Sequence, residues 1–311
     1  MNGVRLIITI ICICMSLLNE ADAQRSQYFD LRRYIGKTEI LDSAKLRVDY
    51  SLSYIRDTLN LSKISRDRKV LLIGDKINKF YSYYVQESDS VLTADWNKGK
   101  NSARVKRSPD ILGEGYELYC NYPEGKRTIV NSITSLSVYK YEEDVENPRW
   151  VIRSETTVIL GYFCIKATGR IGARDYEVWF TPSIPIQLGP WKLAGLPGLI
   201  LKAYDTKKHY TFECIGIEQL KQKQPIVMPQ WAYINTTKEE YKKNERQFYN
   251  DYVTALLSLG FNVNITDGEG NRKISLETPN RYFADRNISH STNIDERDRY
   301  KKLPYNPIEL E

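Results

Sequence analysis

Alternating apolar and polar residues run through most of the chain and predict β-strands. In residues 46–54, Leu, Val and Tyr occupy the even positions while polar side chains occupy the odd ones. This two-residue period is typical of a strand with one buried and one exposed face. Similar runs joined by short turn sequences favour sequential antiparallel pairing. The further predicted strands are Val70–Ile73, Ile77–Val85, Tyr116–Tyr122, Thr128–Ile133, Tyr176–Phe180, Leu199–Tyr204 and His209–Ile217.

A denser apolar run marks the expected centre of the sheet. Residues Thr157–Thr168 carry apolar side chains on both alternating rows, with Val158 and Leu160 on one and Ile159 and Phe163 on the other. Strands covered on both faces have this composition. Together the patterns predict a mainly β fold, a curved, half-barrel-like antiparallel meander sheet with this strand near its centre.

One α-helix is expected near the C-terminal end. Thr236 and Thr237 are suitable N-terminal caps, and Gly260 is a suitable C-terminal stop. The apolar and aromatic residues between them share one helical face: Tyr241, Phe248, Tyr252, Ala255, Leu256 and Leu259. We expect this C-terminal helix to cover an open face of the sheet.

The first 23 residues have the layout of a secretory signal peptide. Arg5 precedes an apolar run at Leu6–Leu18, and small residues follow at Ala21 and Ala23. This run is shorter than the roughly 20 residues that a membrane span needs. Cleavage after Ala23 would leave a periplasmic or secreted protein without a transmembrane span. The predicted organisation is a signal peptide at residues 1–23, a single β-rich domain at 24–265 and a polar, partly extended tail at 266–311.

Charge and composition narrow the function classes. The chain has 45 Lys and Arg against 39 Asp and Glu, a net charge of +6 without long runs of one sign, so nucleic-acid binding is not expected. With only two His residues, no zinc-ligand spacing occurs. The sequence DGEGN at residues 267–271 begins like a calcium loop but departs from that pattern at Arg272 and Thr278. No metal or cofactor is predicted.

Three cysteines remain once the predicted leader is removed: Cys120, Cys164 and Cys214. An odd number permits at most one disulfide within the chain, although the predicted compartment allows such bonds. No CxxC motif occurs. Each cysteine is therefore interpreted as a buried free thiol.

A proline-rich apolar loop separates two predicted strands between residues 180 and 205. Its apolar side chains must pack against other parts of the protein. Pro197–Gly198 predicts a type II turn in which Gly198 has a positive φ angle. The four prolines that interrupt the segment are Pro182, Pro185, Pro190 and Pro197.

The same loop carries the hexapeptide GLPGLI at Gly195–Ile200, which resembles the naming motif of the GLPGLI family of exported Bacteroidota proteins. Other stretches are similar to landmarks of that family: VLLIGDKINKFYS from Val70, ILGYFCIKAT from Ile159, YEVWFTPSIPI from Tyr176, GPWKL from Gly189 and YNPIELE from Tyr305. The resemblance implies a signal-bearing envelope protein, and it supplies no active site to carry over.

Catalytic motifs are not evident, since the chain has no GxSxG nucleophile elbow. The aromatic and loop residues are interpreted either as core or as the lining of a cleft between sheet and loop. These candidate cleft or loop residues are Trp179, Trp191, Leu193, Leu196, Pro197 and Gly198.

The expected function is non-catalytic binding or an accessory role, with an apolar small molecule or another envelope protein as partner. Two alternatives stay open: a hydrolase that uses dispersed carboxylates, and a structural accessory protein without a pocket. A cleft with two close buried carboxylates would favour the hydrolase.

Overall fold

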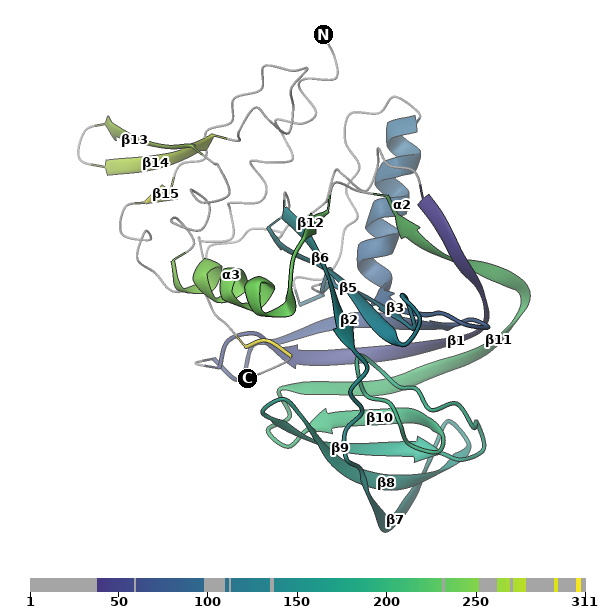
Figure 1. The fold of residues 1–311 in the computed structure, drawn as a ribbon. Helices are drawn as coiled ribbons and strands as arrows, with labels where there is room; N and C mark the ends of the chain where they lie inside the picture. Colours follow the sequence, from purple (N-terminus) through teal and green to yellow (C-terminus); the bar gives the residue numbers. More distant parts are fainter. Residues whose placement is uncertain are drawn as a thin grey trace.

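The structure is a computed structural model that describes residues 38–58, 60–97, 110–111, 113–134, 137–230, 233–251, 262–268, 271–277, 294–295 and 306–308. Within these ranges, twelve strands form one open, curved sheet in the order β12-β6-β5-β4-β3-β2-β1-β11-β10-β9-β8-β7 (Figure 1). The prediction of a mainly β fold built on one large curved sheet is confirmed.

The sheet consists of two meanders joined edge to edge. The first contains β1 (Thr38–Ile55), β2 (Ile64–Ile73), β3 (Asn78–Ser82), β4 (Glu117–Cys120), β5 (Lys126–Thr134) and β6 (Ser137–Asp144). The second contains β7 (Val151–Ile159), β8 (Tyr162–Ile171), β9 (Arg174–Thr181), β10 (Leu199–Asp205) and β11 (Tyr210–Pro229). The long strands β1 and β11 pair antiparallel and form the junction. The short β12 (Ile234–Asn235) pairs parallel with β6.

The core lies on the face of the sheet to which the even-numbered residues of β1 point. Val48, Tyr50 and Leu52 have no solvent-exposed surface, as the alternation in the sequence predicts. Buried Tyr50 donates a hydrogen bond from its hydroxyl to the carbonyl oxygen of Ile200 at 2.8 Å. Because Ile200 belongs to β10, this bond ties the first meander to the second across the core.

The predicted central strand at Thr157–Thr168 is wrong. The chain instead turns at Leu160 and Gly161, which have positive φ angles of 50° and 81°, and forms the β7–β8 hairpin at one end of the sheet. Val158 and Phe163 lie opposite each other in this hairpin and remain 67% and 51% exposed. The apolar residues on both faces of this segment therefore belong to a solvent-exposed hairpin. They do not belong to a strand that is covered on both faces.

The predicted strand Ile77–Val85 is correct only as far as Ser82. Helix α2 (Tyr83–Asn97) begins at the next residue, and Ser82 Oγ accepts a hydrogen bond from the N–H of Val85 at 3.3 Å. A serine that satisfies a free N–H in the first turn favours helix initiation. This local cap converts the end of an apparently continuous strand into a helix start.

Helix α3 (Lys238–Asn250) confirms part of the helix prediction. Thr237 is its N-cap and accepts a hydrogen bond from the N–H of Glu240 at 3.2 Å. Tyr241 is the buried residue of this helix, and its ring stacks on Tyr141 of β6 with 5.2 Å between centroids. One aromatic anchor does not make a sheet-covering helix, so that part of the prediction is not confirmed. The predicted continuation to Leu259 lies outside the described residues.

A second sheet contains β13 (Asn262–Gly268), β14 (Asn271–Glu277) and β15 (Ile294–Asp295). The pairing of β13 with β14 extends to Gly268 and Asn271, which belong to the DGEGN sequence. Residues 1–23, the predicted signal peptide, lie outside the described residues. Among the described helices, none is long and apolar enough to cross a membrane.

Candidate functional site

Strand β2 positions the main candidate side chains. Asp67 and Lys69 pair with Leu52 and Tyr50 of β1, so they point to the same inner face as those core residues. Arg66 and Arg68 alternate with them and point to the outer face. The strand thus carries two acid or base groups into the core and two guanidinium groups to the surface.

Four side chains, three of them buried and Glu114 partly buried, form a group called here the polar cluster: Asp67, Lys69, Glu114 and Tyr116. Lys69 Nζ lies 3.1 Å from Asp67 Oδ2 and 4.0 Å from Glu114 Oε2. It also donates a hydrogen bond to the Glu114 carbonyl oxygen at 3.0 Å. The ammonium lies 3.8 Å from the centre of the Tyr116 ring, a cation–π distance. One lysine therefore holds together two carboxylates that are 47 residues apart in the sequence.

Hydrogen bonds fix Asp67 inside the cluster. Its Oδ2 accepts from the backbone N–H of Glu114 at 3.0 Å, and its Oδ1 accepts from Ser82 Oγ at 2.8 Å. Neither Asp67 nor Lys69 exposes any of its side chain. Paired and hydrogen-bonded charges are the form in which ionised groups are tolerated in a protein interior.

Burial shifts the protonation equilibria of both carboxyl groups. Desolvation raises the pKa of Glu114 to about 7; the nearby ammonium of Lys69 opposes this shift and the negative charge of Asp67 adds to it. Desolvation also raises the pKa of Asp67, against the lowering effect of Lys69 and of the hydrogen bonds it accepts. A carboxyl group that titrates near neutral pH is suited to both donating and accepting a proton.

Two polar atoms of the cluster are buried without a hydrogen-bond partner among the described residues. They are Oε2 of Glu114 and the hydroxyl oxygen of Tyr116. Such atoms are uncommon in protein interiors and are found where strain, catalysis or an absent small molecule accounts for them. The Glu114 side chain as a whole is nevertheless 20% exposed to solvent, so solvent reaches the residue.

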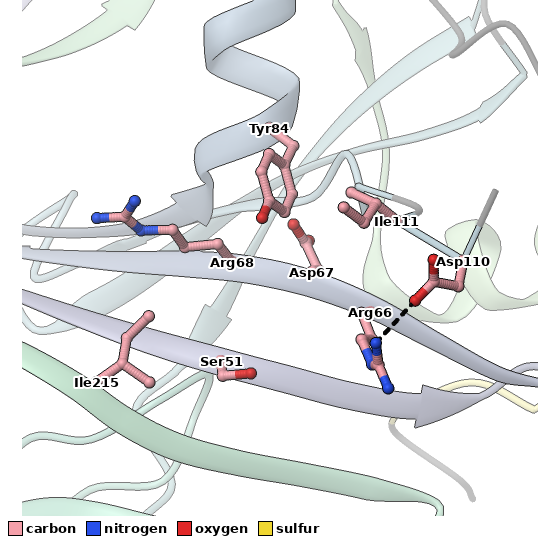
Figure 2. Close-up of a pocket in the computed structure, with 8 residues that line it drawn as sticks. All are labelled: Ser51, Arg66, Asp67, Arg68, Tyr84, Asp110, Ile111 and Ile215. Carbon is pink, nitrogen blue, oxygen red and sulfur yellow. Dashed lines mark ion pairs between the residues drawn. The ribbon is translucent and has the colours of Figure 1, made fainter. Parts of the chain in front are cut away.

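An open pocket of about 220 Å³ adjoins the cluster. Its lining consists of Ser51, Arg66, Asp67, Arg68, Tyr84, Asp110, Ile111 and Ile215. Figure 2 shows Tyr84 descending from the first turn of α2, with Arg66 directed toward Asp110. Asp67 belongs both to this lining and to the polar cluster, so the two features meet at that residue.

The pocket side chains come from segments that the fold brings together. Arg66 forms an ion pair with Asp110, with 3.1 Å between Nη1 and Oδ2. Its backbone N–H donates to the Asp110 carbonyl oxygen at 2.7 Å, and a parallel bridge links Arg66 to Ile111. These bonds fix residues 110 and 111 beside the start of β2 as a wall of the pocket.

The candidate residues chosen from the sequence lie elsewhere. Trp191, Leu193 and Leu196 are 5%, 0% and 1% exposed and belong to the main core. Trp191 packs on Tyr176 at 6.2 Å between ring centroids. Partly buried Trp179 points to the other face of the sheet, where Lys166 lies 6.0 Å from its ring centre. None of the four residues lines the described pocket.

The turn at Pro197 and Gly198 differs from the prediction. Gly198 is not among the described glycines with positive φ, whereas Gly195 has a φ of 91°. A Cβ atom on Gly198 would lie 2.1 Å from the carbonyl oxygen of Thr181. Glycine is needed at position 198 because two backbone segments approach closely, and not because of a type II turn.

Other chemistry is sparse in the described part of the chain. It contains no group of three or more His, Cys, Asp or Glu side chains arranged to hold a metal ion. Cys120, Cys164 and Cys214 are free thiols, the last two buried. Burial raises the pKa of Cys214 to about 11, which disfavours a reactive thiolate. The polar cluster is thus the strongest candidate for acid–base chemistry.

Comparison with known proteins gives one family match. Residues 126–242, from the start of β5 into α3, match the model for the N-terminal domain of N-glycanase peptide, PNGase F-II. Two solved structures of PNGF-II, in space groups P21 and C2, are similar to the chain at 13% identity, with TM-scores of 0.46 and 0.44. They cover 74% and 75% of this chain, which spans only 36% and 40% of theirs. No match was found among curated proteins.

These findings correct two expectations. The resemblance to the GLPGLI family is wrong, because the family model that matches is that of an N-glycanase domain. The expected non-catalytic role toward an apolar ligand or another envelope protein is wrong for the same reason, since the match is to an enzyme.

Proposed function

We propose that this chain is a glycan-related hydrolase that acts on N-linked glycans, with Glu114 as the residue that exchanges a proton and Asp67 as the carboxylate that positions Lys69 beside it. The family match at residues 126–242 supports the substrate class. The single structural observation that carries the proposal is the position of one buried and one partly buried carboxylate, Asp67 and Glu114, around Lys69, with the pKa of Glu114 raised to about 7. Two carboxylates close together are the feature expected of the hydrolase alternative.

The proposed roles of Glu114 and Asp67 in hydrolysis follow from their different surroundings. Hydrolysis requires a base to activate water and an acid to protonate the leaving group. Glu114, with its pKa of about 7, exists in both protonation states at neutral pH and is suited to exchange a proton. Asp67 is held rigidly by Lys69 and by its hydrogen bonds, so it positions the lysine and maintains the electrostatic field on Glu114.

The adjoining pocket supports a ligand rich in hydroxyl groups. Guanidinium donors on Arg66 and Arg68, a carboxylate acceptor on Asp110 and the hydroxyl of Ser51 are grouped around it. Polar groups in a small number of fixed positions provide the orientation that a sugar requires.

The test is release of N-linked glycans from a denatured glycoprotein and from a glycopeptide between pH 4 and 9, measured by electrophoretic mobility and mass spectrometry. We expect release by the wild-type chain and a loss of about 100-fold or more in the Glu114→Gln and Asp67→Asn variants. Glu155→Gln is the matched control, because Glu155 is 55% exposed on the edge strand β7. It should retain the wild-type rate.

Two results would overturn the proposal. The first is no release of glycan by the wild-type chain at any pH in the range. The second is wild-type rates in Glu114→Gln and Asp67→Asn. Far-ultraviolet circular dichroism and thermal unfolding of each variant separate a loss of chemistry from a loss of folding.

A further inference from the structure

Two guanidinium groups line the pocket beside β2. Arg66 uses Nη1 to contact Asp110, yet 65% of its side chain remains exposed. Arg68 contacts Asp49 through Nε at 3.0 Å and remains 38% exposed. Both guanidinium groups line the pocket, so each keeps surface available to a ligand.

The carboxylates nearest to these two arginines, Asp49 and Asp110, already form ion pairs with arginine side chains. Asp49 accepts from Arg68 and also from Arg47, whose Nε lies 2.8 Å from Asp49 Oδ2. Arg47 and Asp49 do not themselves line the pocket, whose lining contains two guanidinium groups, Arg66 and Arg68, and two carboxylates, Asp67 and Asp110. The buried Asp67 is compensated on its own side by Lys69. The carboxylate partners of Arg66 and Arg68 leave part of each side chain exposed, and this exposed part can reach a ligand.

The N-terminus of helix α2 adds positive electrostatic potential beside these guanidinium groups. Tyr84, in its first turn, lines the pocket, and that first turn carries no acidic side chain. Figure 2 shows the start of the helix above Asp67 and Arg68. A helix N-terminus favours a nearby anion, and here it has no acidic residue of its own to satisfy that preference.

We propose that this pocket binds the carboxylate of an acidic sugar residue, such as a uronic or a sialic acid, within the glycan substrate. The proposal rests on the proposed function and names the part of the substrate that the pocket selects. A guanidinium group matches the planar carboxylate with two parallel hydrogen bonds. Ser51 provides a hydroxyl, and Ile111 and Ile215 provide apolar surface for the C–H face of a sugar ring.

The size of the pocket agrees with a single sugar unit. Its volume of about 220 Å³ lies below the roughly 300–1,000 Å³ of pockets that enclose larger organic ligands. The pocket is open to solvent on one side, so the remainder of a glycan can extend outward from it. This geometry suits recognition of a terminal or branching acidic residue and not the enclosure of a long chain.

The test is binding of monosaccharides to the full chain, measured by ligand-detected NMR and calorimetry at low salt. The probes are N-acetylneuraminic acid, glucuronic acid, neutral galactose and inorganic sulfate. We expect the two acidic sugars to bind and galactose to bind at least tenfold more weakly. Arg66→Gln should weaken acidic-sugar binding by about tenfold or more, since a hydrogen-bonded charge pair is worth about 1.5–3 kcal/mol.

Arg170→Gln is the matched control. Arg170 is 64% exposed and forms a surface ion pair with Asp175, so it has nearly the exposure of Arg66 but lies on β8. Its substitution should leave the affinity for acidic sugars unchanged. Arg66→Lys should recover only part of the affinity, because an ammonium group cannot make the paired hydrogen bonds.

Three outcomes would overturn this inference: no binding of either acidic sugar, equal binding of galactose, or sulfate binding as tightly as the sugars with no effect of Arg66→Gln. The last result would identify a nonspecific anion site. Failure of the hydrolase proposal is distinguishable, because it is measured as release of neutral N-glycans with Glu114→Gln. Acidic-sugar binding without hydrolysis would leave this site in place and remove the catalytic assignment.

Discussion

Lys69 Nζ lies 3.1 Å from Asp67 Oδ2, and neither side chain has any exposed surface. The pair belongs to adjacent inner-face positions of one strand, where the neighbouring residues of β1 are Tyr50 and Leu52. A strand that otherwise contributes apolar side chains to the core thus carries a buried ion pair. Buried pairs require full hydrogen bonding to be tolerated, and the Glu114 carbonyl and backbone N–H supply part of it.

Lys69→Met should therefore destabilise the fold by about 3–5 kcal/mol, the range for removing one partner of a buried ion pair. The methionine fills a similar volume but leaves Asp67 charged and unpaired in the core. Urea unfolding followed by tryptophan fluorescence measures the change. Lys202→Met is the control, since Lys202 is 36% exposed in a surface pair with Glu213; it should cost less than about 1 kcal/mol. Equal effects of the two substitutions would contradict this reading of the cluster.

The pKa of Glu114 predicts how stability depends on pH. Because desolvation raises this pKa from 4.5 to about 7, the native state holds the Glu114 proton more tightly than the unfolded state does. The contribution of Glu114 to stability is then complete below about pH 4.5 and decreases as pH rises to about 7. The limiting slope for one proton is about 1.4 kcal/mol per pH unit.

The measurement compares urea unfolding of the wild-type chain and the Glu114→Gln variant from pH 4.5 to 7.5. The free energy of unfolding of the wild type should decrease relative to that of the variant as pH rises, because glutamine does not titrate. Asp67, whose pKa is also raised, contributes in the same direction, and because its charge interacts with Glu114 the difference between the two proteins reports the titration of the coupled pair. Parallel curves would show that Glu114 does not titrate in this range.

The strand pattern in the sequence predicted much of the sheet because alternation reports one-sided burial directly. Residues 46–54 form the middle of β1, and β9, β10 and the start of β11 follow the predicted runs. The same rule failed at Thr157–Thr168, where the turn at Leu160 and Gly161 is concealed inside an apolar run. Apolar composition alone does not distinguish a covered strand from an exposed hairpin.

The candidate site was missed for a different reason. Asp67 and Lys69 precede the predicted strand Val70–Ile73. Their side chains are assigned to the buried face only when the strand is extended back to Ile64, as the structure shows. Glu114 is 47 residues from Asp67, and its approach depends on the pairing of β3 with β4. The sequence shows that charged residues, Asp67 and Lys69, alternate in step with buried strand positions. It does not show that Glu114, which precedes β4, lies beside them in the fold.

Gly198→Ala should destabilise the protein by about 1–3 kcal/mol, the usual cost of overpacking a tight site. The added Cβ would meet the Thr181 carbonyl oxygen at 2.1 Å, so β9 and the following loop would have to separate. Gly216→Ala is the matched control, because no atom lies within 4 Å of its Cβ position and its φ is not positive. That variant should be neutral or slightly more stable. Thermal and urea unfolding of both variants check the contrast, and a neutral Gly198→Ala would contradict the close-approach explanation.

Export remains a prediction from the sequence. The charge at Arg5, the apolar run Leu6–Leu18 and the Ala21–Ala23 segment together predict cleavage after Ala23. Mass spectrometry of the protein recovered from the extracytoplasmic fraction should therefore begin at Gln24. Replacing Ala23 with Arg should block cleavage, and recovery of an intact N-terminus from the wild-type protein would contradict the prediction.

Asn306 is predicted to fasten the C-terminal segment to the sheet. Its Oδ1 accepts from Arg174 Nη2 at 2.6 Å, its Nδ2 donates to the carbonyl oxygen of Ile55, and its own carbonyl oxygen accepts from the Tyr210 hydroxyl at 2.7 Å. The Asn306→Ala variant would lose the two side-chain bonds. Arg174, 2% exposed, would keep Asp205 and the Pro307 carbonyl oxygen as partners but lose its third acceptor. A loss of about 1–3 kcal/mol is expected, the cost of an unsatisfied buried polar group.

Asn235→Ala is the control for this prediction, because Asn235 is exposed on β12 and should change stability by less than about 0.5 kcal/mol. Urea unfolding gives both values, and limited proteolysis adds a local measurement. If Asn306 holds the segment in place, its substitution should increase cleavage after Tyr305 while leaving cleavage elsewhere unchanged below the unfolding transition. Unchanged stability together with unchanged cleavage would mean that the Tyr210 bond to the Asn306 backbone is sufficient to hold the segment.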